Sequence, residues 1–286
     1  MKKEMIILVP TDFSAASRAG MRFALQWARQ QRSKLLVTHV LDMIKYADWG
    51  DKSYEFFAEA QRASVNRRLA KVIHQVCGRA NSPEKTCDSQ VVEGTGVDRV
   101  LADMSRRRHI DLISMGTGGA GTLQKILGTV AGKLLLRSQA PVVVVPAGYR
   151  TKPIKRILYA TDLVDCTPEL VRIVRLTRPL RAEIMAVHIR EKGDAKPDPS
   201  MVSKVWSRQC GCRVDLLYEN ADPDLPMADN LRAAIRRLKP SMVVMFTDRN
   251  KDFFQRLFYP SQAERMALAP GVPLMIMAKS ESANDH

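Results

Sequence analysis

One sequence pattern occurs twice in this chain, and the repeat constrains the fold more than any other feature. ILVPTDFS at residues 7–14 is echoed by ILYATDLV at residues 157–164, and each is an apolar run that reaches Thr-Asp. Three further pairs follow in the same order: LLVTHVLD (35–42) with IMAVHIRE (184–191), LQKIL (123–127) with FQRLF (254–258), and PVVVV (141–145) with PLMIM (273–277). Repetition on the scale of a domain indicates two copies of one folded unit within the 286 residues.

Each half alternates short apolar runs with stretches of helical spacing. MIILVP at residues 5–10 is apolar throughout, as expected of a strand covered on both faces. We therefore predict an α/β protein with two tandem doubly wound, Rossmann-like domains, each built on a five-stranded parallel sheet. The predicted strands are 5–10, 35–40, 89–94, 111–116 and 141–146 in the first half, and 156–160, 183–189, 213–219, 242–246 and 273–277 in the second.

The helices between these strands set the domain limits and show that the second copy is degenerate. Ser14 is the expected N-cap of the first helix, and a long helix is predicted over 53–77. The matching segment 191–200, EKGDAKPDPS, is too rich in Pro and Asp for such a helix. The expected organisation is a domain at 1–147, a linker at 148–153, a degenerate domain at 154–280 and a polar tail at 281–286. The side chains expected inward on the long helix are Phe56, Phe57, Ala60, Ala63, Leu69, Val72, Ile73 and Val76.

Composition excludes several classes of protein. With 45% hydrophobic and 26% charged residues the chain is globular, and it lacks any apolar run of roughly 18 residues that could span a membrane. MKKEMIILVP leads into Pro-Thr-Asp and a helix, so we interpret it as a first strand and not a signal peptide, and we expect a cytoplasmic protein. The net charge of +15 attracts polyanions, but without a recognition motif we do not expect nucleic-acid binding.

Five cysteines at irregular spacing do not form a disulfide framework. Cys210-Gly-Cys212 has no second Cys pair or His to complete a ligand set, so we expect ordinary thiols and no metal site.

Three polar or glycine-rich segments fall at the predicted carboxyl ends of strands, where doubly wound sheets bind ligands. Thr11-Asp12 follows the first strand, His39-Val40 ends the second, and GTGGAG at 116–121 follows the fourth. Glycines let backbone N–H groups approach an anion, and the next predicted helix, starting near Gly128-Thr129, adds its dipole. The convergence predicts a phosphate-binding site in the first half.

Two other phosphate motifs do not apply here. GTGGAG matches G-x-G-x-x-G, but it follows the fourth strand and has no acidic residue about 20 positions later for a ribose. The chain also lacks the Gly-Lys-Ser/Thr of a Walker loop. Lys125 could pair with a phosphate or could be an exposed loop lysine.

With these motifs in this order, the chain resembles the universal stress protein family, in its tandem two-domain form and with an adenine nucleotide alpha hydrolase-like fold. ILVPTDFS, His39-Val40 and Met115-Gly116 carry the resemblance. Nucleotide-binding members have Gly-x2-Gly-x9-Gly-Ser/Thr, whereas this chain has Gly116-x2-Gly119-x8-Gly128-Thr129, one residue shorter.

The resemblance implies an ATP or AMP site, with Mg²⁺ as an accompanying ion. Asp12 and the backbone of Val40 would hold adenine and ribose; the alternative is that Asp12 only closes a turn or caps a helix. The implied nucleotide-binding residues are Pro10, Thr11, Asp12, Val40, Met115, Gly116, Gly119, Gly128, Thr129 and Val130.

The second half retains Asp162 but loses the glycines, so we predict no phosphate site there. Asp248 and Asp252 would repel a phosphate. Another ligand near Phe253, Phe254 and Phe258 remains an alternative to core packing of those rings. The residues that replace the glycines and the helix start are Thr247, Asn250, Tyr259 and Pro260.

Three functions are compatible with these features. The first is a nucleotide-binding regulatory protein of the stress response, the second a scaffold that binds no nucleotide, and the third a slow ATPase. No nucleophile–base pair or paired carboxylates accompany the glycines, so we expect no catalytic residues. His39 is repeated as His188 in the half without the glycines, which favours a structural histidine. By resemblance, strands 141–145 and 273–277 would pair the two domains with each other, and a homodimer is a further expectation.

Overall fold

A computed structural model describes residues 4–42, 51–78, 87–117, 130–194, 196–247 and 271–279. The chain divides into two compact units, and the division along the main chain falls between Thr151 and Lys152. Among the described residues, no helix combines the length and the apolar character that crossing a bilayer requires.

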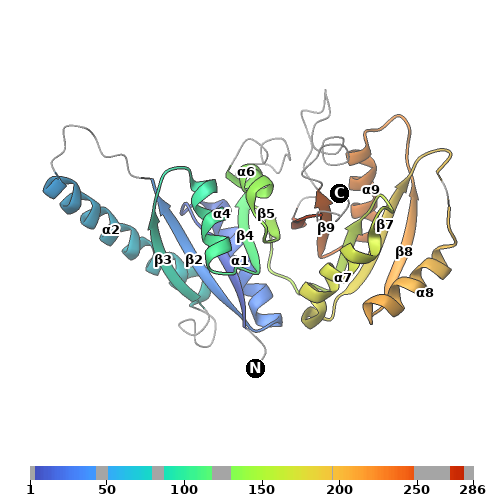
Figure 1. Ribbon diagram of the computed structural model, residues 1–286, viewed down its shortest axis with the longest axis horizontal. Helices are drawn as coiled ribbons and strands as arrows, with labels where there is room; N and C mark the ends of the chain where they lie inside the picture. Colours follow the sequence, from blue (N-terminus) through green and yellow to red (C-terminus); the bar gives the residue numbers. More distant parts are fainter. Residues whose placement is uncertain are drawn as a thin grey trace, which may run out of the picture. The chain divides into compact units, whose positions relative to one another are not determined.

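The first unit is a parallel sheet with the strand order β3-β2-β1-β4-β5 (Figure 1). β1 lies between β2 and β4, with Ile7 opposite Leu35 on one side and Leu112 on the other. The switch in strand order therefore falls between β1 and β4, as the doubly wound prediction requires. Its elements are β1 (Met5–Pro10), α1 (Ala15–Gln30), β2 (Ser33–Leu41), α2 (Asp51–Cys77), β3 (Cys87–Glu93), α4 (Val97–Arg107), β4 (Leu112–Thr117), α6 (Val130–Arg137) and β5 (Val142–Pro146).

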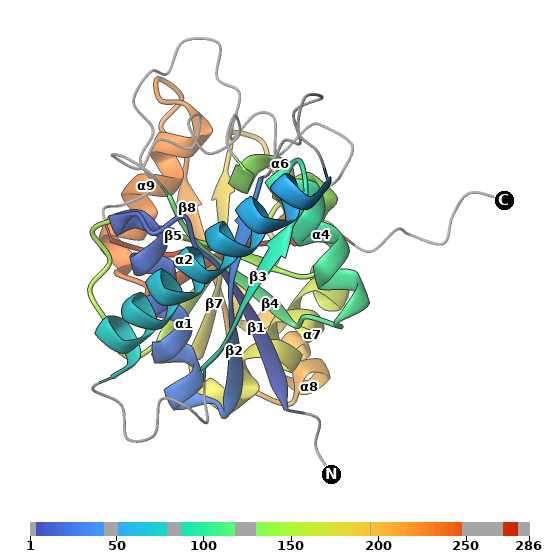
Figure 2. The same cartoon turned by 90° about the vertical axis from the view of Figure 1, so that its left-hand side faces the viewer.

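Helices cover both faces of this sheet. Figures 1 and 2 show α1 and α2 on one face and α4 and α6 on the other. Ser14 caps α1 as expected, since its side chain accepts a hydrogen bond from the backbone N–H of Ser17. The inner face of α1 buries Phe23 and Trp27 completely. Burying two large aromatic side chains on one helix makes α1 the main apolar contact of the sheet's first face.

The prediction of which α2 side chains face inward is wrong for the first half of the helix. Phe56 is 77% exposed and Phe57 40% exposed, and Ala60 and Ala63 are exposed too. Leu69 and Val72 are buried as expected. The helix is 27 residues long, so its first turns extend beyond the strands it covers, and apolar spacing alone could not show where the sheet ends. The buried side of α2 consists of Ala58, Val65, Leu69, Val72 and Cys77.

The segment expected to be the linker begins inside the first unit. Tyr149 is only 3% exposed, and its ring meets Phe23 edge-on at 5.6 Å. Ile154 is likewise buried. The sequence did not indicate that Tyr149 is buried, because glycine, proline and charged residues surround it.

The second unit repeats the same topology in the order β10-β9-β6-β7-β8, again with parallel neighbours. Its α8 has 12 residues where α2 has 27, which agrees with the predicted trimming of this copy. In Figure 1, α7 and α8 cover one face of the sheet and α9 the other. Its elements are β6 (Arg156–Ala160), α7 (Cys166–Thr177), a 3₁₀ turn (Arg178–Leu180), β7 (Glu183–Arg190), α8 (Pro199–Cys210), β8 (Val214–Asn220), α9 (Met227–Leu238), β9 (Met242–Thr247) and β10 (Leu274–Ala278).

Candidate functional site

A tight turn at the carboxyl end of β1 fixes the first candidate residues. The Thr11 Oγ1 accepts a hydrogen bond from the N–H of Phe13 at 3.0 Å, and Asp12 Oδ1 accepts one from the N–H of Ser14 at 2.9 Å. Phe13 has a φ of 67°, in the left-handed region. These bonds lead the chain directly into the N-cap of α1 and leave the second Asp12 oxygen outside the turn.

The second unit builds the same turn, bond for bond. Leu163 donates its N–H to Thr161 Oγ1 at 3.0 Å, Val164 donates to Asp162 Oδ1 at 2.9 Å, and Leu163 has the same φ of 67°. The repeated Thr-Asp is thus a structural turn in both copies. The alternative interpretation of Asp12 as a turn residue is confirmed for Oδ1, which accepts the hydrogen bond from Ser14.

The repeated histidine supports the same turn. His39 Nδ1 lies 2.7 Å from the carbonyl oxygen of Thr11, and His188 Nδ1 lies 2.9 Å from that of Thr161. In the first unit the His39 ring also stacks on Phe13 at 4.6 Å between centroids. This contact occurs in both copies, although only the first has the glycine-rich segment. It therefore agrees with the predicted structural role of the histidine.

The Asp12 side chain is exposed and ionised. Partial burial raises its pKa, but hydrogen bonds from Ser14 and Ser17 favour the charged form more strongly and leave the pKa below its ordinary value. An exposed carboxylate at a strand end can accept further hydrogen bonds from ligand hydroxyl groups. Of its predicted neighbours, Thr11 and Val40 are buried, and Pro10 is half-buried.

Gly116, at the end of β4, serves packing as well as any ligand. A Cβ on Gly116 would stand 1.7 Å from the carbonyl oxygen of Ala16, and one on Gly20 would stand 2.7 Å from the N atom of Gly116. The two glycines therefore let α1 approach the β4 backbone closely. The sequence interpretation gave Gly116 a role at the phosphate only, because it could not show that α1 crosses there.

The second unit has a phenylalanine at the position of Gly116. Ile7 pairs with Leu112 and its repeat Ile157 pairs with Met242, so the strand registers align Gly116 with Phe246. The sequence comparison placed Thr247 among the residues that replace the glycines, whereas the register places Phe246, one residue earlier, opposite Gly116. Because the flanking segment 123–127 still aligns with 254–258, the second copy is one residue longer between them, and the short glycine spacing is not shared by both copies.

Two other residues of the predicted nucleotide site belong to β4 and α6. Met115 is buried in β4, and Val130 is half-buried at the first position of α6. The structure thus brings the ends of β1, β2 and β4 to one edge of the first sheet. The predicted positions outside the described residues are Gly119, Lys125, Gly128 and Thr129 in the first half, and Asp248, Asn250, Asp252, Phe253, Phe254, Phe258, Tyr259 and Pro260 in the second.

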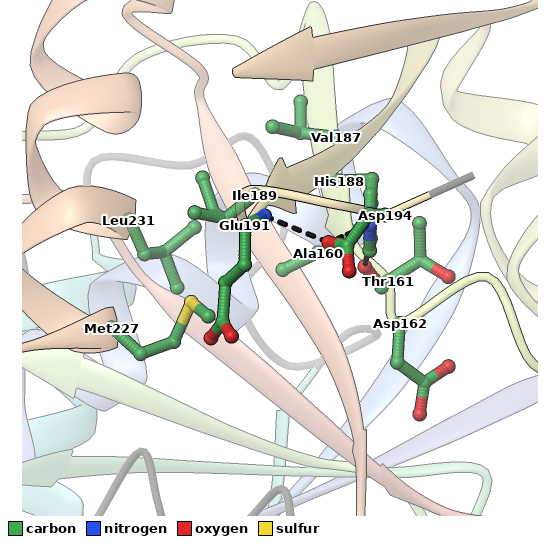
Figure 3. Close-up of a pocket in the computed structure, with 10 residues that line it drawn as sticks. All are labelled: Ala160, Thr161, Asp162, Val187, His188, Ile189, Glu191, Asp194, Met227 and Leu231. Carbon is green, nitrogen blue, oxygen red and sulfur yellow. Dashed lines mark hydrogen bonds and ion pairs between the residues drawn. The ribbon is translucent and has the colours of Figure 1, made fainter. Parts of the chain in front are cut away.

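The second unit has a cavity of ≈180 Å³ at the carboxyl ends of β6 and β7 (Figure 3). Apolar and polar side chains line it in equal number, and Asp162, Glu191 and Asp194 contribute carboxylates. Asp194 accepts a hydrogen bond from the N–H of Glu191 at 2.7 Å and lies 3.7 Å from His188 Nε2. The remaining lining residues are Ala160, Thr161, Val187, Ile189, Met227 and Leu231.

By register, this cavity is the second unit's equivalent of the predicted adenine side. Asp162 and Ile189 correspond to Asp12 and Val40. Sequence reasoning missed the α9 contribution of Met227 and Leu231.

A buried polar cluster fills the space beside Asp162. Lys279, which follows β10, places its Nζ 3.3 Å from Asp162 Oδ2 and 4.0 Å from Glu169 Oε1. Glu169 is 5% exposed, and its other oxygen accepts a hydrogen bond from the Tyr159 hydroxyl. The ring of Tyr159 meets Phe246 edge-on at 6.0 Å. The chain therefore supplies its own cation at this end of the sheet.

Burial raises the pKa of Glu169 to about 7, although the Tyr159 hydrogen bond and the Lys279 charge act in the opposite direction. Nothing in the sequence marked this cluster, since Tyr159, Glu169 and Lys279 come from separate elements. Across the part of the chain that the structure describes, no three His, Cys, Asp or Glu residues are grouped so as to hold a metal ion.

Comparison with known proteins agrees with the fold and the motifs. The profile described as the universal stress protein family matches residues 5–146. Universal stress protein MJ0531 of Methanocaldococcus jannaschii is 26% identical over 141 residues, which are 49% of this chain and 80% of that protein.

Solved structures extend the likeness to both units. The crystal structure of a universal stress protein from Archaeoglobus fulgidus has a TM-score of 0.69 at 18% identity and covers 96% of this chain and 98% of that one. Another, the A. fulgidus universal stress protein in complex with dAMP, covers 50% of this chain and 98% of that one with a TM-score of 0.36 and 16% identity. The chain belongs to the universal stress protein family.

Proposed function

We propose that this chain is an adenine-nucleotide-binding regulatory protein of the stress response, which binds ATP or AMP through its first unit and has no dedicated catalysis. The observation that carries the proposal is the edge formed by the ends of β1, β2 and β4. There the ionised, exposed Asp12 stands beside Val40, and β4 runs into the glycine-rich segment. Asp12 would accept hydrogen bonds from the ribose hydroxyls, and the N–H groups of the loop would receive the phosphates.

Three features of the second unit argue against a phosphate there. Phe246 stands where the first unit has Gly116, so a side chain occupies the strand end. Lys279 is already bound to Asp162. The cavity beside it carries Glu191 and Asp194, whose charges oppose a phosphate. We therefore expect one nucleotide per chain.

We assign the bound nucleotide a regulatory role. The described residues of the first unit offer neither a metal-ligating cluster nor a base beside a nucleophile at Asp12. An accompanying Mg²⁺ would thus take its ligands from the phosphates and water. We further propose that the protein acts in the cytoplasm.

The quaternary proposal rests on the final strands of the two units. β5 and β10 are apolar and each is terminal within its own unit's strand order. Because terminal strands offer unpaired backbone groups, we propose that the two units pair through them and that chains form homodimers. Sedimentation equilibrium tests the homodimer, and a chain that remains monomeric at high concentration would contradict it.

The direct test is nucleotide content. Protein purified without added nucleotide is heat-denatured and its supernatant analysed, and refolded or nucleotide-free chain is then titrated with ATP by calorimetry. We expect released adenine nucleotide or a stoichiometry of one, and loss of binding in Gly128→Val.

Gly116→Val is unsuitable here, because its side chain would collide with α1. Gly148→Ala is the matched control, since a Cβ at Gly148 meets nothing within 4 Å. No release and no binding at millimolar ATP would contradict the proposal and favour the alternative of a nucleotide-free scaffold.

A further inference from the structure

Two cysteines of the first unit, interpreted from the sequence as ordinary thiols, lie in direct contact. Cys77 is the last residue of α2 and Cys87 the first residue of β3, and their sulfur atoms are 3.1 Å apart. The Cys87 thiol donates a hydrogen bond to the Cys77 sulfur. Their spacing in sequence matches no disulfide or metal motif, so only the fold brings them together.

The elements on either side hold this contact in place. Cys87 pairs in register with Leu35 of β2, which anchors the start of β3 to the sheet. Cys77 is completely buried beneath the end of α2, whereas Cys87 is half-buried. Cys87 therefore gives small reagents access to a sulfur pair whose other member is shielded.

The contact shifts the pKa values of the two thiols in opposite directions. The Cys87 hydrogen bond lowers the pKa of the Cys77 thiol below its ordinary value, burial opposes this, and the positive charge of Arg29 lowers it further. The pKa of Cys87 is raised by that same hydrogen bond and by burial. Two thiols in direct contact, one of them with a lowered pKa, are an arrangement from which a disulfide can form.

We propose that Cys77 and Cys87 are a redox modification site, oxidised to an intramolecular disulfide by a hydroperoxide and reduced again by a dithiol. Cys87, the accessible thiol, loses its proton and attacks one peroxide oxygen, the O–O bond breaks, and the leaving oxygen takes up a proton to become water or an alcohol. The second sulfur attacks the resulting sulfenic acid, the S–O bond breaks, and the hydroxyl leaves as water with the remaining thiol proton. Two thiols lose two electrons and two protons, and the peroxide takes up both.

The disulfide would tie the end of α2 to the edge strand β3. It would close a short loop of chain and remove conformations from the unfolded state, so the first unit should melt at a higher temperature when oxidised. Cys210 and Cys212 provide an internal comparison. They are close in sequence, but burial raises the pKa of both thiols, so they should react less readily with a peroxide.

The test oxidises the full chain with hydrogen peroxide and follows intact mass, free thiols in denaturant, and non-reduced peptide maps. We expect a mass loss of two hydrogens, disappearance of two of the five thiols, and a Cys77–Cys87 peptide that dithiothreitol separates. Cys87→Ser should abolish the mass loss, and Cys210→Ser with Cys212→Ser should retain it. The oxidised wild type should also show a raised melting temperature that Cys87→Ser lacks.

Three results would overturn the proposal. One is no mass loss, another is a cross-link mapped to Cys210–Cys212 or between chains, and the third is irreversible gain of oxygen at either cysteine. Because peptide mapping reads the bond in wild-type protein, a folding defect in a variant cannot obscure the answer.

Discussion

The turns that follow the first strand of each unit are closed by the same hydrogen bonds from backbone N–H groups. The two units differ in the residue that the neighbouring strand places beside the turn. The side chains of Thr11-Asp12 and of Thr161-Asp162 accept hydrogen bonds from backbone N–H groups at matching positions. A histidine at a matching position contacts the carbonyl oxygen of each threonine. Near the end of the neighbouring strand, the first unit has Gly116 and the second has Phe246 at the matching position. The turn is thus part of the fold in both units, and under the proposed function the residue beside it distinguishes the unit that binds phosphate from the unit that does not.

The sharpest difference between the units is the glycine contact of α1 with β4, which the second unit lacks. Gly116→Ala should destabilise the first unit by about 3 kcal/mol, because the new Cβ meets the Ala16 carbonyl, which belongs to backbone and cannot rotate away. Hydrogen exchange read by mass spectrometry should show the loss in peptides of β1 and β4.

The matched control for this change is Gly148→Ala, whose Cβ has open space and which should leave exchange unchanged. Equal and small effects of the two substitutions would mean that α1 can move away from β4, and the packing role of Gly116 would then be wrong.

The stability of the second unit should depend on pH through Glu169. Its pKa is about 7 in the folded chain and 4.5 for an ordinary glutamate, so the folded state binds the proton more tightly. The resulting stability is fully present below pH 4.5 and is lost as pH rises through about 7. Glu169→Gln should remove this slope and stabilise the second unit above pH 7 by on the order of 2 kcal/mol relative to wild type.

Urea unfolding at a series of pH values, read by hydrogen exchange in β6, measures this slope. Glu183→Gln alters an exposed glutamate in the same unit and should keep it. A slope that survives Glu169→Gln would show that another group titrates.

Substitution of the two aspartates, Asp12 and Asp162, should have different effects on nucleotide affinity. Asp12→Asn keeps the turn, because an amide oxygen can still accept from Ser14, but it removes the negative charge offered to a ligand. We expect about tenfold weaker ATP or AMP binding, or roughly 1.4 kcal/mol. Asp162→Asn breaks the pair with Lys279 and should leave nucleotide affinity unchanged. If both substitutions weaken binding equally, the second unit also takes part in the site.

The features that depend on neighbouring residues could be predicted from the sequence. The contacts between elements that are distant in the chain could not. The strand order, the Ser14 cap and the carboxyl-end position of Asp12 follow from apolar runs and turn residues, which are local signals. The Tyr159–Glu169–Lys279 cluster and the Cys77–Cys87 contact depend on packing between elements, which spacing does not encode. Phe246 was misaligned with the repeat because only strand register shows which residue stands opposite Gly116.

The smallest difference concerns the left-handed residue of each turn. Phe13 and Leu163 share a φ of 67°, which costs a non-glycine residue about 1 kcal/mol. Leu163→Gly should therefore stabilise the second unit by roughly 0.5 kcal/mol, after the loss of a half-buried side chain. Phe13→Gly relieves the same strain but loses the contact with His39 and that with the Arg68 guanidinium at 4.2 Å, so it should destabilise the first unit slightly.

Differential scanning calorimetry with hydrogen exchange resolves these two changes by unit. Opposite signs would mean that the Phe13 ring is retained for its contacts beside the candidate nucleotide edge, despite its backbone strain. Equal stabilisation by both glycines would mean that the ring contributes nothing there, and the two turns would then be alike in energy as well as in hydrogen bonds.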